Sequence, residues 1–254
     1  MMNKRGQVTI FVIVGLVILV TVFLVFYLLG DKIKKQSEVE TVFDESSLEP
    51  LQDYVGECIE KHGNEAIEKI SNGGKIDPGF YYYYNNEKIN YLCYSDGFGP
   101  CERKEPFLSK LFEDEIKNYV INKLSLCIDL NSLRNEGYDV QEGEMNVDVD
   151  VLEYSTLITL DYPITISKGD SRVSENKFVK TFNVPLGRIA EISKDVIDSE
   201  ISYGEFFNQI YEVKHPEVTV KSYGPVEVVV YTISLRDYDY EFDYEFRFAV
   251  RSWV

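Results

Sequence analysis

An uncharged run from Val8 to Gly30 constrains this chain more than any other feature of its sequence. As a helix the run would reach about 35 Å, because each residue adds about 1.5 Å, and a hydrocarbon core is about 30 Å thick. It is longer than the apolar region of a secretory signal peptide, roughly 7 to 15 residues, and no clear small-residue cleavage site follows it. The sequence therefore predicts a retained transmembrane helix over residues 8–30, preceded by a leader at 1–7. About 220 residues follow, enough for one large domain or two small ones.

Charge indicates which side of the membrane the body occupies. Basic residues flank the run on both sides, so the positive-inside count is close to a tie. Beyond residue 35, however, acidic residues outnumber basic ones by 42 to 21, and so acidic a body would be repelled by an anionic cytoplasmic leaflet. We therefore expect a cytoplasmic amino terminus and an extracellular body. The same excess excludes nucleic acid as an expected partner, because its phosphates would meet net repulsion.

A Lys-Arg-Gly-Gln sequence occupies residues 4–7, and an unbroken apolar stretch follows. These residues resemble the class III signal of archaeal type IV pilins and pilin-like proteins. The resemblance covers residues 4–29 and implies cleavage by a prepilin peptidase between Gly6 and Gln7, after which the apolar helix packs in a filament core or stays in the membrane. The glutamate that this family often carries at the fifth mature position is Phe11 here. An ordinary signal anchor is the alternative.

Helical periods dominate the first half of the body. Residues 31–47 are largely polar and predict a stalk. Apolar residues recur at steps of three and four over 51–70 and again over 108–127, which predicts two amphipathic helices that share one core. Aromatic runs at 80–84 and 88–94 predict a hairpin between these helices.

The period changes to two from residue 144. Strands are expected at 147–151, 157–166, 177–184, 218–223, 226–235 and 238–250. A third helix is expected over 186–201, with a second short piece ending at Tyr211. The whole pattern predicts an α+β fold, in which a single N-terminal transmembrane helix is followed by an ectodomain of amphipathic helices packed on a mainly antiparallel sheet. We expect a helix-rich, disulfide-braced region over 48–135 and a strand-rich region over 136–254, packed as one ectodomain.

Four cysteines, Cys58, Cys93, Cys101 and Cys127, lie beyond the uncharged run and before the strand-rich half. They contain no C-x-x-C pair, which disfavours a zinc site. Cys58 and Cys127 fall on the apolar faces of the two predicted helices, and Cys93 and Cys101 bracket a loop that contains glycines. Among three connectivities we favour Cys58–Cys127 and Cys93–Cys101, which require an oxidising compartment. Four free buried thiols in a cytosol-facing body are the alternative.

Few residues suit catalysis. His62 lies on the apolar face of the first predicted helix, His215 precedes Pro216 in a turn, and no third partner stands at motif spacing, so a Ser, Cys or metal hydrolase has little support. The glycines form neither a G-x-G-x-x-G motif nor a phosphate loop. The sequence predicts no enzyme, no cofactor and no resident metal, and a hydrolase that uses carboxylates alone is a minor alternative.

The sequence leaves two functional hypotheses. The first is a membrane-anchored, extracytoplasmic, pilin-like structural or surface-interaction protein, whose partners would be membrane lipid, a prepilin peptidase, further copies of itself or other envelope proteins. The second is a membrane-tethered module that binds carbohydrate or divalent cations. Its basis is the carboxylates two residues apart at Asp148, Asp150 and from Asp237 to Glu245, together with tyrosines such as those at 81–84. A solvated strand face and core packing are the plainer interpretations of these two patterns.

Overall fold

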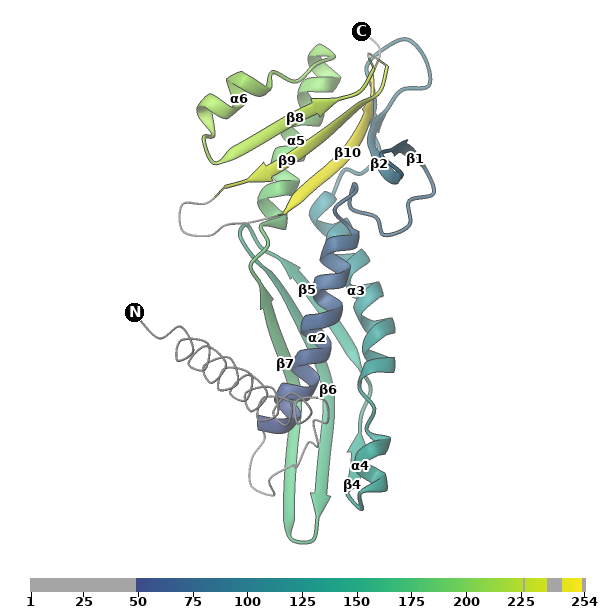
Figure 1. The fold of residues 1–254 in the computed structure, drawn as a ribbon, viewed down its shortest axis with the longest axis vertical. Coiled ribbons are helices and arrows are strands. Elements are labelled where there is room, and N and C mark those ends of the chain that lie inside the picture. Colours follow the sequence, from purple (N-terminus) through teal and green to yellow (C-terminus); the bar gives the residue numbers. More distant parts are fainter. Residues whose placement is uncertain (1–48, 226, 237–243, 253–254) are drawn as a thin grey trace, which may run out of the picture. The chain divides into compact units, whose positions relative to one another are not determined.

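The computed structural model describes residues 49–225, 227–236 and 244–252, drawn in colour in Figure 1. The chain divides into two units, 1–43 and 44–254, and the described residues all belong to the second unit. Its helices are α2 (Glu49–Lys69), α3 (Leu108–Cys127), α4 (Asn131–Asn135), α5 (Leu186–Tyr203) and α6 (Asn208–Lys214). Its strands are β1 (Tyr81–Tyr84), β2 (Glu87–Tyr94), β3 (Glu102–Arg103), β4 (Asp139–Glu142), β5 (Asn146–Val151), β6 (Thr156–Lys168), β7 (Ser171–Phe182), β8 (Val218–Tyr223), β9 (Val229–Leu235) and β10 (Glu245–Arg251).

The predicted fold class is corrected at its membrane-spanning element. Within the described ranges, no helix is long and apolar enough to cross a membrane. The physical reason is that α2, α3 and α5 are amphipathic, with charged side chains along the face turned away from the core. The predicted leader, span and stalk, at 1–7, 8–30 and 31–47, lie outside the described residues. A second difference is that the strands form two sheets, of six and four strands, rather than one.

The four-stranded sheet is built around β6. Strand β7 pairs with β6 along its whole length, and β5 and β4 share the other edge of β6 in succession. Side chains such as Ile158, Leu160 and Ile164 are fully buried on the face that α2 and α3 cover (Figure 1). At Gly63 in α2, an added Cβ would lie 2.3 Å from a ring carbon of Phe182. The absence of a side chain at Gly63 therefore lets α2 approach the end of β7.

The six-stranded sheet joins both predicted regions. Its order is β1-β2-β10-β9-β8, with β3 also paired to β2. Strand β10 pairs antiparallel with β9 and parallel with β2, so it lies between a strand of the helix-rich region and a strand of the strand-rich region. Phe246 of β10 contacts Phe112 of α3 edge to face, with ring centroids 5.4 Å apart. Both rings are fully buried, so α3 contributes to the core of this sheet.

Candidate interaction site

Two disulfides close loops in the helix-rich region. Cys58 of α2 is bonded to Cys127 at the end of α3, with Cα atoms 6.0 Å apart, and Cys93 of β2 is bonded to Cys101, with Cα atoms 5.4 Å apart. These are the two pairs favoured from the sequence, and disulfide bonding is confirmed. Neither bond leaves a cysteine for metal binding or thiol chemistry, since all four residues are paired.

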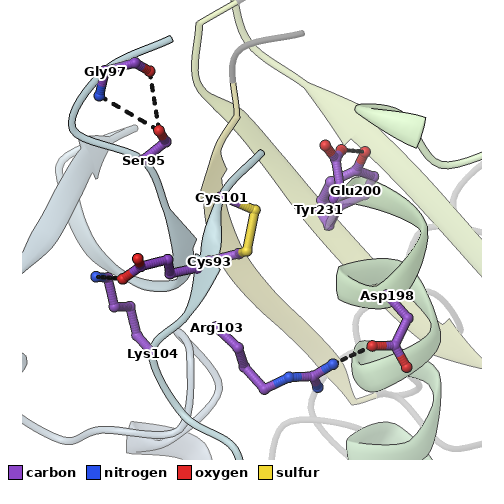
Figure 2. Close-up of a disulfide and its surroundings, with 10 residues drawn as sticks. Cys93, Ser95, Gly97, Cys101, Arg103, Lys104, Asp198, Glu200 and Tyr231 are labelled. Atoms are coloured by element: carbon purple, nitrogen blue, oxygen red, sulfur yellow. Dashed lines mark hydrogen bonds and ion pairs between the residues drawn. A yellow bond between two sulfur atoms is a disulfide. The ribbon is translucent and has the colours of Figure 1, made fainter. Parts of the chain in front are cut away.

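The Cys93–Cys101 disulfide positions the segment that leads into α3 (Figure 2). It brings residue 101 back beside β2, and β3 follows at once as an antiparallel partner of β2. Arg103 in β3 then forms an ion pair with Asp198 of α5. The disulfide, the strand pairing and the ion pair together fix this segment against α5.

A cavity of about 400 Å³ lies between the start of α3 and α5. Three of its lining residues, Leu108, Ala190 and Ile197, are almost completely buried and form an apolar floor, whereas Phe107 is 77% exposed. The volume falls within the range of about 300 to 1,000 Å³ that is usual for ligand pockets. The floor suits an apolar group of a partner molecule.

The charged residues that line the cavity are paired with other charges of the protein. Arg103 and Lys194 both contact Asp198. Lys110 contacts Glu113 at 3.2 Å and Asp114 at 3.1 Å. Since these basic groups already have acidic partners, the cavity offers no obvious counter-charge to a charged ligand. Its chemistry favours contact with an apolar side chain over binding of an ionic small molecule.

Sequence reasoning missed this cavity because it forms only where two distant segments meet. Its one local signal is Phe107, an aromatic residue after Pro106 that the apolar stripe of the predicted helix does not use. In the structure Phe107 directly precedes α3, and its side chain forms no capping hydrogen bond with the helix. Its ring lies at the surface of the protein.

A buried acid lies near the cavity but does not line it. Glu200 of α5 and Tyr231 of β9 are 2% and 3% exposed, and the Tyr231 hydroxyl donates a hydrogen bond to Glu200 Oε1 (Figure 2). Desolvation raises the pKa of Glu200, and the hydrogen bond from Tyr231 only partly opposes this shift. The arrangement joins α5 to β9 through a carboxyl group that is shielded from solvent.

Both histidines make local contacts. His62 is 9% exposed and its Nδ1 lies 3.0 Å from Glu65 Oε2, which also accepts a hydrogen bond from the Tyr119 hydroxyl. The His62 hydrogen bond is the main cause that lowers the pKa of Glu65. The His215 ring lies against that of Tyr211, with centroids 4.4 Å apart. Both positions suit packing between neighbouring elements.

The acidic rows do not converge on a metal site in the part of the chain that the structure describes. Asp148 forms an ion pair with Lys117 of α3 at 3.2 Å, and Glu245 forms one with Arg247 at 3.2 Å. No group of three or more His, Cys, Asp or Glu side chains in this part is placed to hold a metal ion. Residues 237–243 of the second row lie outside the described ranges.

The tyrosines of the predicted hairpin divide between packing and exposure. Tyr91 is 7% exposed, and Phe80 packs on it with ring centroids 4.9 Å apart. Tyr82 and Tyr84 are partly buried against the same cluster. Tyr83 is 62% exposed, on the opposite side of β1. The hairpin therefore supplies a small exposed aromatic surface together with its own packed core.

The predicted processing site, Gly6 and Gln7, lies outside the described residues. Comparisons of the chain with family models, with curated proteins and with solved structures found no match. The functional argument therefore depends on the residues and their geometry.

Proposed function

We propose that this protein is an extracytoplasmic structural or surface-interaction protein that works through contacts and not through catalysis. The observation that carries the proposal is the pair of disulfides, Cys58–Cys127 and Cys93–Cys101. Disulfides persist in oxidising compartments and are rare where glutathione keeps thiols reduced. The resemblance of residues 4–29 to pilin-like proteins supports the same side of the membrane and adds the expectation of cleavage between Gly6 and Gln7.

The surface chemistry supports contact as the mode of action. The cavity beside Phe107 has an apolar floor and charges that are already paired, as expected for a place that receives a side chain of a partner protein. The buried acid Glu200 is shielded from solvent and does not line this cavity. Glu200 is bonded to Tyr231 of β9 and therefore serves packing between α5 and β9.

Non-reducing peptide mapping of the full-length protein tests the proposal. Cells are lysed in an alkylating reagent, so that free thiols are tagged before they can oxidise. We expect two disulfide-linked peptide pairs that contain the four cysteines. We also expect the intact mass to be that of a mature chain that begins at Gln7. Four alkylated cysteines, or a tyrosine-rich body that survives protease added to intact cells, would overturn an extracytoplasmic role.

A carbohydrate-binding module is the second candidate, and the exposed tyrosines of β1 favour it. Tyr81 and Tyr83 are 41% and 62% exposed, on a strand that lies at the edge of its sheet. Aromatic rings of this kind can stack on sugars because they combine an apolar face with a hydroxyl group. A shift of the melting temperature with a glycan panel, lost in Tyr83→Ala and kept in Tyr203→Ala, is the result that this candidate requires.

A further inference from the structure

Helix α6 turns its polar side chains toward the protein. Asn208 Nδ2 donates a hydrogen bond to the carbonyl oxygen of Val220 in β8 at 2.8 Å, and the Val220 amide donates one to Glu212 Oε1 at 2.8 Å. The Tyr211 hydroxyl donates a third to Asp195 of α5 at 2.9 Å. No residue of α6 is buried. This helix is therefore held in place by hydrogen bonds from its side chains.

The outward side of α6 is apolar. Phe207, Ile210 and Val213, which we call the α6 stripe, are 48%, 59% and 84% exposed and recur at steps of three. A surface helix normally has the reverse arrangement, with its apolar stripe toward the core. A contiguous exposed apolar surface marks an interaction site. The α6 stripe is such a surface, and its helix lies on the outer side of β8 (Figure 1).

Opposite charges stand at the two ends of the α6 stripe. Glu205 precedes the helix and Lys214 ends it, and both side chains are exposed. Neither has an ion-pair partner among the residues that the structure describes. A helix that packs antiparallel on α6 and carries the same charges would satisfy both ends at once.

We propose that the α6 stripe is covered by α6 of a second copy of this chain, packed antiparallel about a two-fold axis near Ile210. Ile210 then faces Ile210 of the second copy, and Phe207 faces Val213. Glu205 of each copy lies beside Lys214 of the other, which gives two ion pairs. Such a self-complementary patch is what a two-fold dimer interface requires. The inference rests on the proposed interaction role, for which it names another copy as a partner.

Charge and geometry favour a second copy over a lipid surface. The acid at one end of the α6 stripe and the base at the other complement each other under a two-fold axis, whereas a lipid surface presents the same headgroups to both ends. Strand addition at β8 is blocked, because Asn208 and Glu212 occupy the outward carbonyl and amide of Val220. Each copy contributes one seven-residue helix, so the interface belongs to the small class, below about 1,200 Å² in total, and the dimer is weak and depends on concentration.

Crosslinking of full-length chains tests the contact directly. Unlabelled and ¹⁵N-labelled protein are mixed in a mild detergent, because of the uncharged run at residues 8–30, and treated with a carbodiimide that joins touching carboxylates and amines. We expect a mixed-isotope peptide that links Glu205 to Lys214. Ile210→Asp places two carboxylates at the axis and is expected to abolish the link. Leu126→Asp, at an apolar residue of α3 that is even more exposed than Ile210, is the matched control and should keep it.

Charge exchange separates the interface from general folding effects. Glu205→Lys alone and Lys214→Glu alone should each weaken self-association at least tenfold in sedimentation equilibrium, and the double variant should restore it. Absence of a mixed link at about 100 μM protein, a concentration at which even a weak dimer is populated, overturns the inference. So does Ile210-dependent binding to phosphatidylcholine vesicles without that link. If the crosslinked peptide is missing while both disulfides are intact, only the dimer is rejected. If the four cysteines are found as free thiols, the proposed function is rejected.

Discussion

At the scale of single residues, the pH dependence of stability should depend on Glu200. Its pKa is raised by desolvation in the folded protein from an ordinary value of 4.5. A carboxyl with a raised folded pKa contributes its full stability below the unfolded pKa and loses it as pH rises through the folded pKa. Glu200 therefore lowers the free energy of unfolding at neutral pH relative to pH 4.

Glu200→Gln is expected to raise the free energy of unfolding at pH 7.5 and to change it little at pH 4, because glutamine stays neutral and still accepts the hydrogen bond from Tyr231. Urea unfolding of the full-length protein at both pH values measures this difference. Glu57→Gln, at an exposed position of α2, is the control. An equal gain at the two pH values would show that ionisation of Glu200 is not its cause.

Gly187 of α5 is a second residue whose identity the fold requires. An added Cβ would lie 2.5 Å from the carbonyl oxygen of Leu152, to which the Gly187 amide donates a hydrogen bond at 3.1 Å. Gly187→Ala should lower the free energy of unfolding by about 1 to 3 kcal/mol, because backbone atoms must move apart. Thermal melting compares it with Gly79→Ala, where the new methyl group meets nothing within 4 Å. Equal melting temperatures in the two variants would contradict this.

The sequence predicted the roles of residues that follow from local spacing. It did not predict the roles of residues that depend on distant partners. Cys58 and Cys127 lie on stripes of adjacent helices, so their pairing followed from periodicity. Glu200 is acidic and resembles a surface residue in the sequence, but in the fold it is buried and bonded to Tyr231 of β9. Gly187 likewise has no local pattern, since the atom that it must avoid belongs to Leu152, in the loop between β5 and β6.

At the scale of elements, the β1–β2 turn contains a conformation that favours glycine. Asn85 and Asn86 have φ angles of 48° and 66°, and Tyr84 pairs with Glu87 across them, which is the two-residue hairpin turn with both central residues left-handed. Asn86→Gly should stabilise the protein by up to about 1 kcal/mol, because glycine adopts this conformation without steric cost. Denaturant unfolding measures the increase in the free energy of unfolding. Asn86→Ala is the control and should lower that free energy.

The attachment of α6 to β8 gives an element-scale prediction that is independent of the dimer. Glu212 accepts a hydrogen bond from the amide of Val220, and Asn208 donates one to the carbonyl oxygen of Val220. Glu212→Ala should therefore increase hydrogen exchange at the Val220 amide at least tenfold, since loss of a buried hydrogen bond costs about 1 to 3 kcal/mol. Gln209→Ala, on the same helix, should leave that rate unchanged. Exchange as slow in Glu212→Ala as in the parent protein would rule out this attachment.

The long helices were predicted within a few residues because amphipathic periodicity is a local signal. Strand β7 was expected at 177–184 but begins at Ser171. Its first half is polar apart from Val173, and it is extended because it pairs with the apolar strand β6. The short strands β3 and β4 were missed for the same reason, since two or four residues carry too little pattern of their own.

At the scale of the described unit, the position of β10 could not be predicted from the sequence. It pairs in parallel with β2, from which it is separated by most of the chain, and no periodicity specifies such a neighbour. Three contacts connect the two predicted regions. They are this pairing, the Phe112–Phe246 ring contact, and the hydrogen bond that the Arg247 amide donates to the Ser71 carbonyl oxygen. The regions therefore contribute to one sheet, and stability should be a property that they share.

The two disulfides should stabilise this shared unit unequally. Cys58–Cys127 spans 69 residues and Cys93–Cys101 spans 8. Because a longer closed loop removes more entropy from the unfolded chain, the chain-entropy model gives about 4 kcal/mol for the first bond and about 2.5 kcal/mol for the second. A Cys58→Ser, Cys127→Ser double variant should therefore lose more free energy of unfolding than a Cys93→Ser, Cys101→Ser double variant.

Urea unfolding of the two double variants and the parent, purified as full-length chains, measures these losses. The loop model ranks the variants by loop length alone. The short disulfide, however, also holds the segment that carries Arg103 to Asp198 and forms one side of the cavity beside Phe107. If removal of the short disulfide lowers the free energy of unfolding as much as removal of the long one, the loss beyond the value from the loop model comes from those native contacts. The positioning of the candidate site would then contribute directly to the stability of the unit.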